Sequence, residues 1–313
     1  MQKIATREAY GRALVQLGHQ DPRVVVLDAD LSRSTMTVYF AREFPHRFFN
    51  MGVAEQSLMG TAAGLALCGK IPFASTFAVF ASGRAYDQIR NGIAYPALNV
   101  KIAATHGGLS VGEDGASHQA LEDITLMRVI PNMTVIVPAD AEETRQAVFA
   151  AARHEGPVYL RLGRLPVPVI YEEEYVFQIG RAHILREGED AAIIACGLMV
   201  HEALRAAEEL DSLGFKVLVV NMSTIKPLDR EAVLRAARTG AVVTAEEHSV
   251  IGGLGSAVAE VLAQELPTPM AMVGVKDTFG ESGKPQELLE KYGLTHRHIL
   301  QAVLTLKRAP LGR

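Results

Sequence analysis

Residues 49–67, FNMGVAEQSLMGTAAGLAL, place one carboxylate at the start of an otherwise apolar helix. The segment reads as the end of a strand, a turn at Gly52 and a helix of small apolar residues that begins at Glu55. A negative charge in the first helical turn often does no more than compensate the helix dipole. Apolar surroundings, however, disfavour the charged form of a carboxyl group and suit proton exchange near neutral pH. Glu55 is therefore a candidate for a proton-handling site.

Strands and helices alternate on both sides of this segment. Apolar, β-branched runs predict strands at 23–30, 48–54, 71–76, 100–106, 133–140 and 157–163, and helices at 55–67, 79–94 and 141–154. Strands that are apolar on both faces and separated by helices are typical of a parallel, doubly wound sheet. We therefore expect an α/β domain over residues 1–165.

The pattern changes at residues 166–185, which we expect to form a linker. The stretch 164–180, RLPVPVIYEEEYVFQIG, contains two prolines and the acidic run 172–174, and it predicts a linker that leads into a short hairpin. Strands are then expected at 190–197, 216–229, 240–248 and 269–277, with helices at 198–213, 229–238, 253–266 and 285–307. The fold class expected for the whole chain is two doubly wound α/β domains, of which the second, 186–313, is smaller.

Composition argues against several classes of protein. The chain has 313 residues, of which 49% are hydrophobic and 21% charged, which suits one or two well-filled domains. A net charge of −4 gives no electrostatic case for binding nucleic acid or an anionic membrane. Cys68 and Cys196 lie far apart in apolar settings and read as reduced core thiols. Because we find neither a secretory signal nor an apolar run of ~20 residues, we expect a cytoplasmic protein.

Polar residues that follow strands indicate where the chemistry lies, because open α/β sheets bind ligands outside the carboxyl ends of their strands. The densest such segment is THGGLSVGEDGASHQALED at 105–123, in which glycines surround His106, Asp114 and His118. An ordinary glycine-rich surface loop is the alternative, which the presence of two histidines and two acidic residues in one loop disfavours. A metal site is disfavoured, because the cysteines are remote and the histidines lack short ligand spacing.

Two segments resemble a known family. GVAEQSLMGTAAGLAL (52–67), followed by FASTFAVFASGRAYDQIR (73–90), resembles the pyrimidine-binding domain of thiamine-diphosphate enzymes. THGGLSVGEDGASHQALEDITLMRVIPNMTVIVPAD (105–140) is specifically similar to transketolases, and the second half of the chain looks like their C-terminal domain. The resemblance implies transfer of a two-carbon ketol unit from a ketose phosphate to an aldose phosphate, with thiamine diphosphate and Mg²⁺.

The resemblance also implies roles for residues that bind the cofactor. Glu55 would pair with the pyrimidine ring and exchange a proton with it, which makes it a catalytic residue. Phe80 would stack on that ring with Phe77 nearby, and Asp30 would lie near the cofactor. Where the family has a further aromatic residue after Phe80, this chain reads Ala81-Ser82-Gly83.

Further matches imply a substrate site. The sugar-phosphate cradle implied by the resemblance consists of Arg7, Ser34, His106 and Arg161. Asp114 would hydrogen-bond a substrate hydroxyl and favour one stereochemistry. His118, the second catalytic residue, would contact the donor's oxygens around the transferred unit.

The same resemblance predicts a partner. Full-length transketolases bind the diphosphate and Mg²⁺ (or Ca²⁺) through a GDG…N motif in an N-terminal domain, and we find no such motif here. We therefore expect the C-terminal subunit of a split transketolase, without metal ligands of its own, which joins an N-terminal subunit in an α₂β₂ assembly around a homodimer core.

The second domain is expected to serve packing and dimerisation, with the glycines of 246–258 forming an ordinary strand-to-helix turn. The alternatives are a deoxyxylulose-phosphate synthase-like enzyme, a 2-oxo-acid dehydrogenase β subunit, and a non-catalytic binding protein with the same fold.

Overall fold

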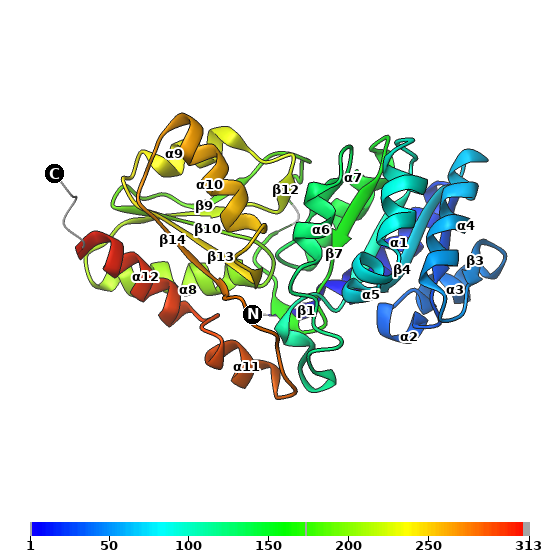
Figure 1. Cartoon of the computed structure of the whole chain (residues 1–313), viewed down its shortest axis with the longest axis horizontal. Helices are drawn as coiled ribbons and strands as arrows, with labels where there is room; N and C mark the ends of the chain where they lie inside the picture. The colour runs from blue at the N-terminus through cyan, green and yellow to red at the C-terminus, as the bar shows by residue number, and fades with distance from the viewer. Residues whose placement is uncertain (1, 173, 309–313) are drawn as a thin grey trace.

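The computed structural model describes residues 2–172 and 174–308. Over these residues the chain forms two α/β units that lie side by side, each with a sheet between helices (Figure 1). This confirms the fold class expected from the sequence. Residue 173 of the expected acidic run, and the outermost residues of both expected domains (1 and 309–313), lie outside the described part.

The first unit is built on a largely parallel sheet. Its order is β12–β6–β7–β5–β4–β2–β3. The parallel strands are β2 (Val24–Asp28), β3 (Phe48–Asn50), β4 (Ile71–Phe77), β5 (Lys101–Thr105), β6 (Thr134–Ile136) and β7 (Val158–Arg161). The central strands are buried along their whole length, as expected where helices cover both faces. Their carboxyl ends therefore share one edge.

Helices on the two faces of this sheet form separate packing clusters. One face carries α1 (Thr6–Gln20), α3 (Val38–Glu43) and α7 (Ala141–Arg153). The other carries α4 (Glu55–Leu67), α5 (Ala78–Arg84), the π-helical segment η2 (Gln88–Ala94) and α6 (Asp123–Val129). The helix expected at 79–94 is thus α5 and η2 in succession. Short elements fill the connections: α2 (Ser32–Thr35), η1 (Pro45–Arg47) and the 3₁₀ segment η3 (Leu109–Asp114).

The second unit has the sheet order β14–β13–β10–β11–β9. β10 (Ala191–Ala195), β11 (Val217–Asn221), β13 (Val242–Ser249) and β14 (Met270–Val275) run parallel, and β9 (His183–Arg186) is antiparallel to β11. One face is covered by α8 (Met199–Ser212) and α12 (His296–Arg308), and the other by α9 (Arg230–Ala237) and α10 (Leu254–Glu265). No helix in 2–172 or 174–308 is long and apolar enough to cross a bilayer.

Several connections differ from the sequence-based expectation. The strand expected at 216–229 is two strands, and the later one, β12 (Thr224–Lys226), joins the first sheet antiparallel to β6. The hairpin expected near 164–180 is replaced by pairing of β8 (Pro166–Pro168) with β1 (Lys3–Ala5) at the N-terminus. The helix expected at 285–307 is α11 (Pro285–Lys291) and α12, separated by Gly293 at φ +77°.

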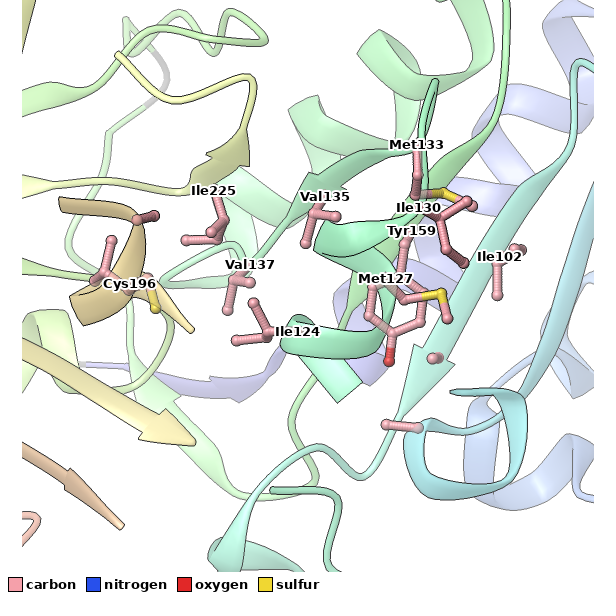
Figure 2. Packing of buried hydrophobic residues seen from close by; sticks show 14 of the residues in the cluster. Ile102, Ile124, Met127, Ile130, Met133, Val135, Val137, Tyr159, Cys196 and Ile225 are labelled. Atoms are coloured by element: carbon pink, nitrogen blue, oxygen red, sulfur yellow. The ribbon is translucent and has the colours of Figure 1, made fainter. Parts of the chain in front are cut away.

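One apolar cluster extends through both units. Figure 2 shows Ile225 of β12 and Cys196, which follows β10, close to Val135, Val137 and Ile124 of the first unit. Backbone bonds join the same region: the amide of Val137 donates to the carbonyl of Ser223 at 2.7 Å, and that of Gly197 to the carbonyl of Val137 at 3.3 Å. The two units are therefore joined by continuous apolar packing and by backbone hydrogen bonds.

Close approach of α1 to the segment 36–44 places the first turn of α1 at the edge of the sheet. A Cβ at Gly11 would lie 2.5 Å from the carbonyl oxygen of Met36, and one at Gly18 would lie 2.5 Å from the ring of Phe44. Glycine is required because backbone, which cannot swing aside, lies opposite Gly11. Arg7 is thereby held within reach of the turn that contains Ser34.

We expect Gly11→Ala to lower the free energy of unfolding by roughly 1–3 kcal/mol through overpacking. The matched control is Gly64→Ala in α4, where an added methyl group meets no atom within 4 Å. That variant should gain about 0.5–1 kcal/mol from helix propensity. Urea unfolding of both variants measures the difference, and equal effects would contradict the close packing at Gly11.

Candidate active site

The carboxyl edge of the first sheet brings aromatic side chains together. Phe77 is in register with Thr105, so Phe77 and His106 leave neighbouring strands at the same level. Their rings stack with centroids 3.7 Å apart. Phe80, in the first turn of α5, stacks on Phe77 at 5.7 Å and meets the ring of His118 edge-on at 5.2 Å. Both expected ring-binding residues and both histidines of the glycine-rich loop therefore form one patch.

Glu55 joins this patch through an arginine that the sequence analysis did not identify. The Glu55 side chain is buried, and Nη1 of Arg84 donates to its Oε1 at 2.8 Å. The same guanidinium lies 4.0 Å from the centroid of the Phe80 ring, while the Arg84 side chain is half exposed. The spacing of four residues between Phe80 and Arg84 along one helix was the available signal. A planar, hydrogen-bond-donating group thus fits between the ring and the carboxylate.

Arg7 connects α1 to the histidine at the end of β5. Its Nη1 donates to the carbonyl of Ser34 at 2.8 Å and lies 3.3 Å from Nε2 of His106. Nδ1 of His106 is 2.8 Å from Oγ1 of Thr105. Burial, together with the charges of Arg7 and Arg164, lowers the pKa of His106 to about 3. The imidazole is therefore neutral at physiological pH, and Nε2 accepts from Arg7 while Nδ1–H faces Thr105.

The turn that presents Ser34 is built around a buried carboxylate. Asp28, the last residue of β2, accepts from the amide of Leu31 at 2.6 Å and from the hydroxyl groups of Thr35 and Thr37 at 2.6 and 2.9 Å. These bonds shape the segment that contains α2, and they make Asp28 a structural residue that lies beside the expected site.

Arg161 does not join the other expected phosphate ligands. Its guanidinium is buried, with Nε donating to Oδ2 of Asp123 at 2.8 Å and Nη2 donating to the carbonyls of Ala120 and Glu247 at 3.1 and 3.0 Å. Because these contacts lie inside the protein, the structure does not leave this guanidinium facing the site. This geometry argues against phosphate binding by Arg161, and the expectation stays a prediction for experiment to test.

Arg164, beyond the end of β7, lies close to Arg7 and to the glycine-rich loop. Its side chain is 36% exposed, and Nη1 is 3.6 Å from Oδ2 of Asp114 and 3.7 Å from Oε2 of Glu113. It also donates to the carbonyl of Val111, which ties it to the glycine-rich loop. Burial and the charge of Arg164 lower the pKa of Arg7, so the two cations lie close to each other. An anion placed between them would relieve their repulsion.

Asp30, which follows β2, lies at the same edge of the sheet. It is exposed, has φ +63°, and accepts from Nδ2 of Asn50 at 2.7 Å. Asp114 is exposed and His118 is partly exposed, so both can meet a ligand from solvent. Among the residues that the structure describes, no group of His, Cys, Asp or Glu has an arrangement suited to holding a metal ion.

The glycines of 246–258 do not form an open anion site. The carboxylate of Glu246 accepts from the amides of Leu254 and Gly255 at 2.7 and 2.8 Å, so the start of α10 already holds a negative group. This agrees with the expectation of strand-to-helix turn chemistry.

Comparisons with known proteins identify the family to which the chain belongs. Residues 2–169 match the family model of the transketolase pyrimidine-binding domain, and residues 180–299 match that of the transketolase C-terminal domain. The chain belongs to the transketolase family. It corresponds to the C-terminal section of that family, as the sequence analysis expected.

The match covers nearly all of some transketolase relatives and about half of others. A protein of Methanocaldococcus jannaschii described as a transketolase C-terminal section is 54% identical, with 95% of each chain covered. A 6-deoxy-6-sulfo-D-fructose transketolase subunit from a Clostridium species is 48% identical over 95% of this chain and 92% of that one. Mouse transketolase-like protein 2 is 43% identical, and there the match covers 96% of this chain but 48% of the relative.

Solved structures show the same division. A split-gene transketolase, described as an inactive β4 tetramer, has a TM-score of 0.91 and 62% identity, and the match covers 97% of this chain and all of that one. The transketolase of Campylobacter jejuni has a TM-score of 0.85 and 25% identity over 97% of this chain and 47% of that one.

Removing Arg84 should expose both the carboxylate of Glu55 and the face of Phe80. We expect Arg84→Ala to bind thiamine roughly three- to tenfold more tightly than the wild-type chain, because one partly exposed ion pair and one cation–π contact no longer compete. The control is Arg90→Ala, which removes an exposed arginine side chain that donates a hydrogen bond to Asn91. Calorimetric titration of the isolated chains measures this, and unchanged or weaker binding in Arg84→Ala alone would contradict the competition.

Proposed function

We propose that this chain is the C-terminal subunit of a split transketolase, which moves a two-carbon ketol unit from a ketose phosphate to an aldose phosphate. The observation that carries the proposal is the single patch in which Glu55, the stacked rings of Phe77 and Phe80, and the two loop histidines meet. The near-complete match to a split-gene transketolase chain supports it.

Thiamine diphosphate is the cofactor that we propose for this patch, with Asp30 as a further contact at its exposed end. The position of Arg84 supports the fit, because a flat guanidinium already stacks on Phe80 while it donates to Glu55. When bound, the cofactor supplies the nucleophilic carbon of ketol transfer. Glu55 would hold and move a proton at the pyrimidine nitrogen, and Phe77 and Phe80 would keep water away from that nitrogen.

The sugar phosphate would bind at the basic side of the patch. We assign its phosphate to Arg7 and Arg164, with Ser34 and His106 beside them, since two neighbouring guanidinium groups favour an anion between them. His118 would contact the oxygens of the transferred ketol unit. Asp114 would accept a hydrogen bond from a substrate hydroxyl and so favour one stereochemistry.

A partner chain is proposed to cover the patch. Gly60 and Gly64 of α4, Gly83 of α5 and Gly92 of η2 face open space, and each exposed helical glycine costs roughly 1 kcal/mol relative to alanine. Such positions permit close approach of another backbone. We assign Mg²⁺ and the diphosphate to an N-terminal subunit in an α₂β₂ assembly with a homodimer core; the β4 assembly described for the related chain supports self-association.

One relative suggests sulfonated sugars as a second class of donor. The Clostridium protein is a subunit of a 6-deoxy-6-sulfo-D-fructose transketolase. Sulfonate and phosphate are both tetrahedral anions, so a cradle of two guanidinium groups suits either. Parallel assays with fructose 6-phosphate and its 6-deoxy-6-sulfo analogue distinguish the two.

The split-enzyme proposal predicts that the chain is inactive alone. We expect no ketol transfer and weak binding of thiamine diphosphate by the purified chain, and a gain of both after addition of the N-terminal subunit with Mg²⁺. In the assembly, Glu55→Gln should lower kcat by at least ~10²-fold while it leaves cofactor binding largely intact, because an amide cannot replace a general acid. Full activity without a second polypeptide, or a fully active Glu55→Gln assembly, would overturn the proposal.

Assigning the phosphate to Arg164 in place of Arg161 predicts an effect on KM for one substitution and an effect on stability for the other. Arg164→Ala should raise KM for phosphorylated donors roughly tenfold or more, with little change for hydroxypyruvate, because a charged hydrogen bond contributes about 1.5–3 kcal/mol. Arg161→Ala should instead lower the free energy of unfolding by about 3–5 kcal/mol, since Asp123 would stay buried without its counter-ion. Steady-state kinetics and urea unfolding separate these roles. A phosphate-specific KM effect in Arg161→Ala would restore the original assignment.

A further inference from the structure

The second unit lies against the loop that carries Asp114 and His118. Gln119 donates to the carbonyls of Gly112 at 3.2 Å and of Glu281 in the second unit at 2.9 Å. The amide of Ser249, at the end of β13, donates to the carbonyl of Leu121 at 2.8 Å. The loop is therefore in contact with the second unit through backbone and side chain, although no residue of that unit was expected near the substrate.

Two adjacent glycines, Gly107 and Gly108, allow the start of the loop to contact buried charged side chains. A Cβ at Gly107 would lie 2.7 Å from Nε of Arg161, and one at Gly108 would overlap the carboxylate of Glu247. Gly108 has φ +90°, which disfavours any other residue type there. Arg161 belongs to β7 and Glu247 to β13, so the loop is clamped by one charged side chain from each unit.

Glu247 also holds the loop by a hydrogen bond. Its Oε1 accepts from the amide of Ser110 at 2.5 Å, and its backbone carbonyl accepts from Nη2 of Arg161 at 3.0 Å. Ser110 lies in the first turn of η3, the segment that ends at Asp114. A buried carboxylate that accepts from a backbone amide forms a strong, directional contact. The orientation of η3, and with it that of Asp114, thus depends on a side chain of the second unit.

We propose that Glu247 is a positioning residue for ketol transfer, which acts from the C-terminal domain by fixing the loop 107–118 through Gly108 and Ser110. The proposal rests on the function proposed above, because it assumes that Asp114 and His118 bind substrate. It gives the second domain a role in substrate selection in addition to packing.

Glu246 provides a matched control. It is the neighbouring residue on β13 and is also buried, and burial raises the pKa of both carboxyl groups to about 7. Its carboxylate, however, bonds the amides of Leu254 and Gly255 inside the second unit. Glu246→Gln and Glu247→Gln therefore make the same chemical change on one strand, and only Glu247→Gln weakens a contact with the loop.

The first experiment requires neither partner nor activity. Amide hydrogen exchange of the full chain at pH 8 is compared for the wild type, Glu247→Gln and Glu246→Gln, with β10 and β11 as internal references. We expect Glu247→Gln to accelerate exchange in 109–114 by about tenfold, because a neutral amide oxygen replaces the charged acceptor of the Ser110 amide. Glu246→Gln should accelerate exchange at 254–255 and leave the loop unchanged.

The second experiment measures substrate selection in the reconstituted enzyme. The ratio of kcat/KM for D-glyceraldehyde over L-glyceraldehyde reports the contact that Asp114 makes, because the enantiomers differ only in the direction of one hydroxyl. We expect the ratio to fall about tenfold, or to unity, in Glu247→Gln and to stay unchanged in Glu246→Gln. General damage to the protein would lower both rates and leave the ratio constant.

The outcomes separate this inference from the proposed function. Unchanged loop exchange in Glu247→Gln, or equal loop exchange in both variants, overturns the positioning role whatever the enzyme does. Faster loop exchange with an unchanged enantiomer ratio also overturns the positioning role. In that case the contact between Glu247 and the loop would have no effect on substrate selection. Failure of the reconstituted wild type to transfer ketol units overturns the proposed function instead. If Glu247→Gln does not fold, Glu247→Asp, which withdraws the carboxylate by one methylene, is judged by the same criteria.

Discussion

The ion pair between Arg161 and Asp123 is the contact on which the arrangement of the site depends. Both side chains are buried, so neither can move into the interior without a counter-charge, and removal of one partner of such a pair is strongly destabilising. The same guanidinium fixes the carbonyls of Ala120 and Glu247 and supports the backbone of Gly107. One residue of β7 therefore contacts the beginning and the end of the glycine-rich loop and β13 of the second unit.

A rigid frame surrounds this contact. β12 leaves the second unit to extend the first sheet, and the apolar cluster of Figure 2 continues from Ile102 on one side of the junction to Cys196 on the other. Because packed interiors do not deform continuously, the carboxyl edge of the first sheet and the end of β13 keep one relative position. The loop between them can hold side chains toward a ligand without secondary structure of its own beyond a short 3₁₀ segment.

The edge itself carries features that are unfavourable in an isolated chain. Arg7 and Arg164 lie close enough to lower the pKa of Arg7, Arg84 covers the Phe80 ring and the Glu55 carboxylate, and bare glycines lie along α4. In the proposed assembly, each of these features would gain a favourable partner. An anion would bind between Arg7 and Arg164, a planar ring would replace the Arg84 guanidinium on Phe80, and the backbone of a second chain would pack against the glycines. Local conflicts of this kind are expected at functional sites, where ligand and partner supply the missing interactions.

The sequence by itself determined the fold class, the family and most of the residues that meet at the candidate site, and the roles of those residues stay predictions. Alternating strands and helices depend on local periodicity, and residues that directly follow parallel strands, such as His106, must share an edge. Tertiary structure alone decided which arginine is buried, which sheet takes β12, that Arg84 meets the carboxylate of Glu55, and that Glu247 contacts the glycine-rich loop. The reason is physical, because Arg161 and Arg164 have the same chemistry and similar local sequence. Only the distant carboxylate of Asp123 and the packing of the second unit make Arg161 an internal counter-ion and leave Arg164 partly exposed.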